Sequence, residues 1–142
     1  MNKDLLFVLT ALEAISKTKL YSNPFSNAQD LFEFGEQLHF NAILKMLEVI
    51  GEEANKIDEE VLTDYPAIPW RAIKDMRNRI VHDYRGVDID IVFSVIKDEL
   101  PNLKQTLEII FFKLITHVTQ NIFLLKFQAA FFQSTVFFRR AL

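Results

Sequence analysis

Apolar residues recur at steps of three and four along most of this 142-residue chain, and this spacing constrains the fold more than any other feature. The step matches the 3.6-residue turn of an α-helix with one buried face. Only three glycines and four prolines interrupt the pattern, which disfavours a turn-rich β architecture. Half of the residues are hydrophobic, enough to bury one substantial core. The sequence therefore predicts an all-α protein.

The apolar pattern places three helices in the first half of the chain. A first helix covers residues 3–19, where apolar side chains form one stripe. The capping-box spacing of residues 26–29 predicts a short second helix. The longest uninterrupted pattern predicts a central helix over residues 36–62.

Two further helices follow the proline-containing turn at residues 64–69. Pro69 suits the first position of a helix that Gly86 ends. A last helix over residues 89–110 carries Pro101, where we expect a kink. Together these elements predict an antiparallel four- to five-helix bundle in residues 1–110.

Residues 111–142 have a different composition and are predicted to be a separate C-terminal extension. They hold eight of the fourteen phenylalanines and no acidic residue. We favour an extension of the bundle or an oligomer surface. A membrane span is disfavoured by the central Lys126 and several amide side chains, although the length suffices. The third interpretation is a poorly ordered or non-native tail, such as one produced by a frame change.

Charge is distributed unevenly, and this limits the kind of nucleic-acid contact that the chain can make. Residues 1–110 carry twelve basic and nineteen acidic side chains, a net charge of −7, whereas the extension carries +4. Broad affinity for nucleic acid needs many neutralised phosphates, so an RNA contact must be local. The RNA-binding candidates are the basic residues around one short motif: Arg71, Lys74, Arg79 and Arg85.

The chain offers no sign of a metal or disulfide site. It has no cysteine, and its three histidines, at 39, 82 and 117, are scattered. Asp88 and Asp90 fit a solvated helix start better than a metal site. We therefore expect no cofactor. Because the first residues lack a secretory leader, we expect a cytoplasmic protein.

The run at residues 77–84 holds the candidate catalytic groups. Arg77 is a permanent cation whose planar fork suits phosphate oxygens, and His82 can move protons near neutral pH. In RNA cleavage, His82 would take the proton of a ribose 2′-hydroxyl while Arg77 stabilises charge on the phosphoryl oxygens. This interpretation competes with a simpler one, in which Asp75, Arg79 and Asp83 form an ordinary helix charge ladder.

On an ideal helix Arg77 and His82 do not share a face. They lie about 140° apart around the axis and ~7.5 Å apart along it. A shared site then needs a reaching arginine, a frayed helix end near Gly86, or a second copy across a two-fold axis. Asn78 aligns with His82 at a spacing of four, and Tyr84 aligns with Arg77 at a spacing of seven.

The motif in its context resembles the HEPN superfamily, and within it the HepT-like group (formerly the DUF86 family). Residues 77–84 fit its Arg-x4-His-x-Tyr signature, and segments at 47–54, 68–71, 86–88, 91–92 and 100–104 are also similar. The likeness covers roughly residues 3–110, so it is more specific than the signature alone. The extension at residues 111–142 departs from the family pattern.

The resemblance implies a homodimeric, metal-independent ribonuclease that acts as the toxin of a type VII toxin–antitoxin pair. Its implied catalytic residues are Arg77 and His82, assisted by Asn78. Its implied partner is a minimal nucleotidyltransferase antitoxin, which would transfer AMP to Tyr84 and so block RNA. The alternative is a noncatalytic HEPN module that only binds a nucleotidyltransferase.

Overall fold

The computed structural model describes residues 3–140 of the chain, and the side chains of residues 3–129. Every regular element in this range is helical, so the predicted all-α bundle is confirmed. The elements are α1 (Lys3–Ser22), α2 (Ala28–Glu33), a 3-10 turn η1 (Phe34–Gln37), α3 (Leu38–Ala54), α4 (Glu59–Thr63), α5 (Trp70–His82), a 3-10 turn η2 (Tyr84–Gly86), α6 (Ile89–Ser94), a π-helical turn η3 (Val95–Glu99) and α7 (Leu100–Arg140).

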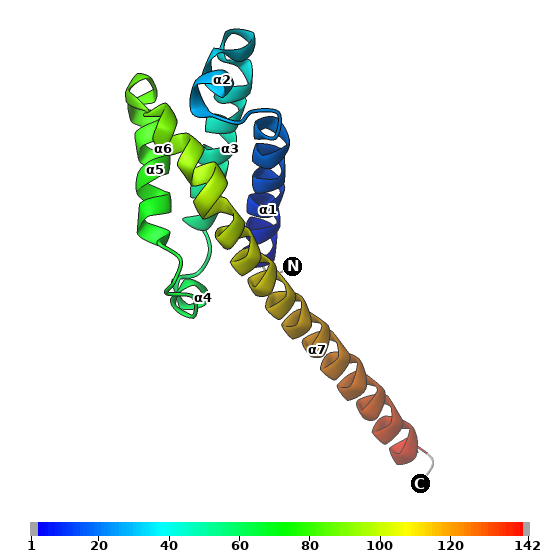
Figure 1. The fold of residues 1–142 in the computed structure, drawn as a ribbon. Helices are drawn as coiled ribbons and strands as arrows, with labels where there is room; N and C mark the ends of the chain where they lie inside the picture. Colours follow the sequence, from blue (N-terminus) through cyan, green and yellow to red (C-terminus); the bar gives the residue numbers. More distant parts are fainter. Residues whose placement is uncertain (1–2, 141–142) are drawn as a thin grey trace.

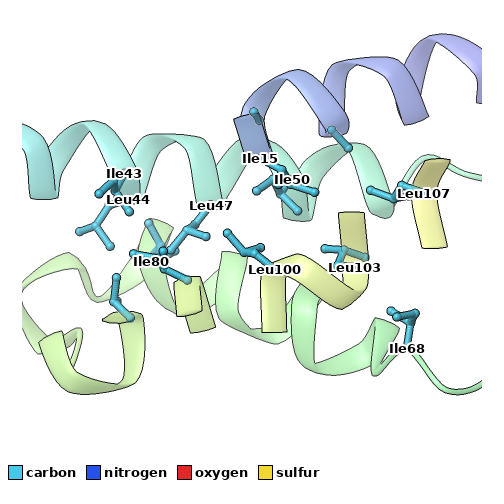
Figure 2. Close-up of a cluster of buried hydrophobic side chains, with 14 of the residues drawn as sticks. Ile15, Ile43, Leu44, Leu47, Ile50, Ile68, Ile80, Leu100, Leu103 and Leu107 are labelled. Atoms are coloured by element: carbon cyan, nitrogen blue, oxygen red, sulfur yellow. The ribbon is translucent and has the colours of Figure 1, made fainter. Parts of the chain in front are cut away.

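Helix α3 lies at the centre of the bundle, and its buried residues recur at steps of three and four from Phe40 to Ala54. Helix α1 packs along one side of α3 and α5 along another, while the first part of α7 packs against α1. Figure 2 shows Ile43, Leu44, Leu47 and Ile50 of α3 facing side chains from α1, α5 and α7. These four side chains are fully buried, and they connect the surrounding helices into one core.

The prediction of one helix over residues 36–62 is wrong, because the chain turns between α3 and α4. Ile57 lies in this turn and is buried, which preserves the apolar spacing although the helix has ended. A hydrogen bond to α1 holds this turn in place: the backbone N–H of Asp58 donates to Oδ1 of Asp4 over 3.2 Å. A contact between residues 54 positions apart cannot be inferred from local periodicity.

Other boundaries differ by a residue or a turn. Helix α1 continues to Ser22 rather than residue 19. The second helix is present, but its cap is Asn27, whose Oδ1 accepts from the backbone N–H of Asp30 over 2.8 Å. Pro69 is the residue just before α5, and the helix ends at His82, with Gly86 closing the 3-10 turn that follows.

The expected irregularity near Pro101 is a π-helical turn rather than a simple kink. Residues Val95–Glu99 form this turn, and the N–H of Leu100 bonds the carbonyl of Val95, five residues back. A proline cannot donate to the helix ladder, so a widened turn just before it is one way to keep the helix continuous.

Helix α7 runs without a break across residue 110 and extends far beyond the bundle (Figure 1). Near its exit from the bundle, α7 forms a salt bridge with the residue that follows α4: Nζ of Lys113 lies 2.7 Å from Oδ2 of Asp64. The hydrogen bond to Asp64, with its charge, holds the pKa of Lys113 above its ordinary value. The predicted division into 1–110 and 111–142 stays a prediction, since one helix spans the boundary.

Candidate active site

The candidate site begins with an unusually close approach of α5 to α3. Gly51 is buried in the last turns of α3, directly against Arg77 of α5. A Cβ atom added at Gly51 would lie 2.3 Å from the Cβ of Arg77 and 3.2 Å from the carbonyl oxygen of Ile73. Only a glycine leaves room for this contact, so residue 51 sets the position of the arginine backbone.

The neighbouring residue of α3 holds the arginine side chain. Nη2 of Arg77 forms an ion pair with Oε1 of Glu52, and Nη1 donates to Oδ1 of Asn78 over 2.8 Å. The side chains of Arg77 and Glu52 are 31% and 33% exposed. Nε of Arg77 is buried and has no hydrogen-bond partner in the described chain. The guanidinium is thus fixed at the edge of α3.

His82 and Asn78 lie on the exposed side of α5. Both are in the same helix at a spacing of four, and both are exposed, as is Arg71 at a spacing of seven from Asn78. Residues at these spacings fall on one helix face. Arg77 lies on another face, and its polar partners are Glu52 and Asn78 rather than His82. Asn78 therefore connects the arginine to the face that carries the histidine.

Tyr84 lies apart from this arrangement. The alignment of Tyr84 with Arg77 on one helix is wrong, because α5 ends at His82 and Tyr84 begins the 3-10 turn η2. Its hydroxyl donates to Oδ1 of Asn41 in the first turn of α3, and the tyrosine is 47% exposed. Asn41 and Glu52 are eleven residues apart, about 16 Å along the helix. The phenol and the guanidinium thus contact α3 at well-separated points.

The predicted basic residues do not form one patch. Arg71 is the most exposed, with a side chain 96% accessible and only a long 3.9 Å contact to Asp75. Arg85 is exposed on η2, whereas Lys74 is partly buried on α5. Arg79 lines a groove on the flank of α5 about 160° around the helix axis from Arg77. Of the four RNA-binding candidates, Arg71 is the one on the helix face of His82.

A groove lies beside Arg79, on the flank of α5. It has a volume of about 720 Å³ and lies between α5 and the helix formed by α6, η3 and the start of α7. Its walls are mainly apolar, with Ile50 and Leu100 at the core and Asp75, Asp88 and Arg79 among its polar residues. The chemistry of this groove therefore differs from that of the polar edge around Arg77.

Asp88 and His39 have structural partners. Asp88 caps α6, since its Oδ1 accepts from the N–H groups of Asp90 and Ile91 over 2.9 and 3.2 Å. Nδ1 of His39 lies 3.1 Å from the carbonyl oxygen of Tyr21. Within the described residues, no group of three or more His, Asp or Glu side chains is arranged to hold a metal ion.

Sequence reasoning missed three residues that shape the site: Gly51, Glu52 and Asn41. A glycine inside a strongly periodic helix is the one local signal that could have indicated a close helix contact. Glu52 and Asn41 carry no such signal, because their roles depend on which parts of α3 meet α5 and η2.

Comparison with known proteins identifies the group to which this site belongs. The family model described as ribonuclease HepT-like matches residues 11–110, which include the whole run from Arg77 to Tyr84. The chain belongs to the ribonuclease HepT-like family. The resemblance read from the signature is thereby confirmed at the level of the family. No solved structure is significantly similar to the chain.

Several relatives carry ribonuclease names. A protein of Methanocaldococcus jannaschii described as a candidate RNase is 28% identical over 94 residues, which are 59% of this chain and 86% of the relative. The "Probable ribonuclease HepT" of Thermococcus cleftensis is 36% identical over 67 residues, 47% of this chain and 61% of the relative. A second M. jannaschii protein, described as a gamma-glutamylcyclotransferase and candidate RNase, is 30% identical over 106 residues, 74% of this chain and 46% of the relative.

Proposed function

We propose that this HepT-like chain is a metal-independent endoribonuclease whose reacting groups are Arg77 and His82. The observation that carries the proposal is the Arg77 guanidinium held by Glu52 and by Asn78, a residue on the helix face of the exposed His82, in a chain of a ribonuclease-named family. An anchored cationic fork is suited to a phosphodiester, since little reorganisation is needed when charge develops.

The chemistry uses the RNA's own hydroxyl as the nucleophile. The imidazole of His82 accepts the proton of the 2′-hydroxyl, and the 2′-oxygen attacks the adjacent phosphorus. The bond from phosphorus to the 5′-oxygen breaks, and this oxygen takes up a proton from an imidazolium or from water. The products are a 2′,3′-cyclic phosphate and a free 5′-hydroxyl. Arg77 stabilises the charge on the phosphoryl oxygens, and Asn78 orients Arg77.

The test is RNA cleavage in the presence of EDTA by the native chain and three variants. We expect His82→Ala and Arg77→Ala each to lose at least about a hundredfold in rate, because the first removes the general base and the second removes the stabilisation of developing charge. His117→Ala is the matched control, since it removes an exposed histidine on α7. Equal cleavage by all four proteins would refute the assignment. RNA or nucleotidyltransferase binding without cleavage would favour the noncatalytic HEPN module instead.

A two-fold pair of chains would explain how the two reacting groups meet. Within one chain Arg77 and His82 occupy different faces of α5, so a second copy can supply the complementary group. Mixing inactive Arg77→Ala and His82→Ala chains tests this arrangement. If each site draws its arginine and histidine from different copies, the mixture regains activity because the mixed dimer has one intact site. A mixture that stays inactive despite subunit exchange would refute the shared site.

The regulatory part of the proposal is a type VII toxin–antitoxin pair. A minimal nucleotidyltransferase antitoxin would transfer AMP to Tyr84, a residue that is half-exposed. The added phosphate and adenosine would repel and block RNA near the histidine. Incubation with such an enzyme and ATP should add the mass of AMP to the native chain and not to Tyr84→Phe. Unchanged mass of the native chain would refute this step without affecting the nuclease assignment.

A further inference from the structure

The outer half of α7 exposes more apolar surface than any other part of the described chain. Beyond the bundle this helix continues alone (Figure 1). Ile122, Phe123, Leu125 and Phe127 are 48%, 70%, 65% and 63% exposed. Contiguous apolar patches of this kind on soluble proteins mark interaction sites or aggregation-prone surfaces.

The apolar residues of this segment include a regular heptad series. Steps of three and four alternate without exception through Ile115, Val118, Ile122, Leu125 and Ala129. The sequence extends the same series to Phe132 and Val136, which gives three full heptads. Alternating steps of three and four define the a and d positions of a left-handed coiled coil. The series begins where α7 leaves the bundle, so its outer positions have no partner within the described chain.

The identity of the residues points to a second copy in parallel orientation. Ile115 and Ile122 at a positions with Leu125 at a d position match the combination that favours two parallel strands, whereas Val118 at d and Ala129 at a do not follow it. The flanking e and g positions between Thr119 and Thr135 are all polar: Thr119, Asn121, Lys126, Gln128, Gln133 and Thr135. In a parallel pair Lys126 faces Asn121 of the other copy, so no like charges meet at this position.

We propose that the outer half of α7 forms a parallel, in-register, two-stranded coiled coil with α7 of a second copy of this chain. The described part of the seam is the series from Ile115 to Ala129. This inference stands independently of the proposed nuclease, because none of the seam residues belongs to the candidate site.

A lipid bilayer is the competing partner for the same segment. By length and composition alone, the helix over Ile89–Ala129 could cross a membrane, and 11% of its most apolar stretch of 18 residues is buried. Lys126 in the middle and the polar e and g rows oppose a span, because unpaired polar groups are costly in hydrocarbon. The two partners differ in a measurable way. A bilayer contacts all faces of the helix, whereas a coiled coil depends on the seam.

Cysteine cross-linking of the full-length chain distinguishes the seam from the opposite face. The native chain has no cysteine, so Ile122→Cys and Phe127→Cys each introduce a single thiol. Ile122 is at an a position, where equivalent residues of two parallel copies meet, and Phe127 is at the f position on the far side. In detergent-free buffer, mild oxidation should yield a covalent dimer of Ile122→Cys and leave Phe127→Cys uncoupled. No cross-link at Ile122, or equal cross-linking at both positions, would overturn the proposal.

A vesicle experiment tests the competing partner directly. The native chain is mixed with phosphatidylcholine vesicles and centrifuged through a density gradient. We expect the protein to remain at the bottom, apart from the lipid. Flotation of the native chain with the vesicles, reduced equally by Ile122→Lys and by Phe127→Lys, would overturn the coiled coil. Neither experiment uses RNA, so a failed nuclease proposal would not affect the outcome.

Discussion

Replacement of Gly51 by alanine tests whether the glycine sets the position of Arg77. The new methyl group would lie 2.3 Å from the Cβ and 3.0 Å from the Cγ of Arg77. Carbon atoms in unstrained contact are about 3.5–4.0 Å apart, so α5 would have to move by roughly 1 Å or more. Two Cβ atoms cannot avoid each other by rotation, because both are fixed to the backbone.

Two opposing effects determine the magnitude of this change. Alanine in a helix interior is favoured over glycine by about 1 kcal/mol. Overpacking of a tight contact costs about 1–3 kcal/mol, and this rigid contact belongs at the upper end of that range. The net expectation for Gly51→Ala is a loss of roughly 2 kcal/mol in the free energy of unfolding. For a chain of this size that lowers Tm by roughly 4–8 °C.

Thermal and urea unfolding, followed through the single tryptophan at position 70, measure this loss. The double variant Gly51→Ala/Arg77→Gly removes the opposing Cβ atom and should be more stable than Gly51→Ala alone, a non-additive result that indicates direct contact. If Gly51→Ala were as stable as the native chain or more stable, helix propensity would be the only effect. The close approach of α5 to α3 would then be refuted.

Two further substitutions test the core and a helix cap. Leu47→Ala in the fully buried centre of α3 should lower the free energy of unfolding by about 2–5 kcal/mol. Its control Leu9→Ala, at a residue that is 50% exposed, should change this free energy by about 0.5 kcal/mol or less. Similar losses for the two variants in urea unfolding would contradict the central place of α3. Asp88→Ala should lower the free energy of unfolding by about 1 kcal/mol, because it removes the acceptor of two backbone N–H groups. Its control Asp90→Ala should lower this free energy clearly less. A larger loss for Asp90→Ala than for Asp88→Ala would contradict the cap.

The helices could largely be predicted from the sequence because each buries one apolar face. In α1, α3 and α5 the apolar residues recur at steps of three and four because these residues form the buried face. The turn after Ala54 could not be predicted, since Ile57 is buried in the turn and continues the spacing of the helix before it. The hydrogen bond from Asp58 to Asp4 that fixes the turn joins distant parts of the chain.

The candidate site shows the same division between local and distant information. The placement of Arg77, Asn78 and His82 on one helix followed from local pattern, as did their distribution over different faces. The partners that hold the arginine and the tyrosine, Glu52 and Asn41, come from α3 and depend on how the helices pack. Local pattern gives the residues of such a site, and packing gives their orientation.

The π-helical turn at Val95–Glu99 fixes the rotational phase of everything that follows it in α7. One residue more or fewer in this turn would rotate the rest of the helix by about 100° relative to the bundle. The stripe through Ile115 and Ile122 would then face a different side, and Leu100 and Leu103 would lose their places in the core. A single-residue deletion at this point would thus turn the apolar face of the projecting helix without altering the sequence of that face.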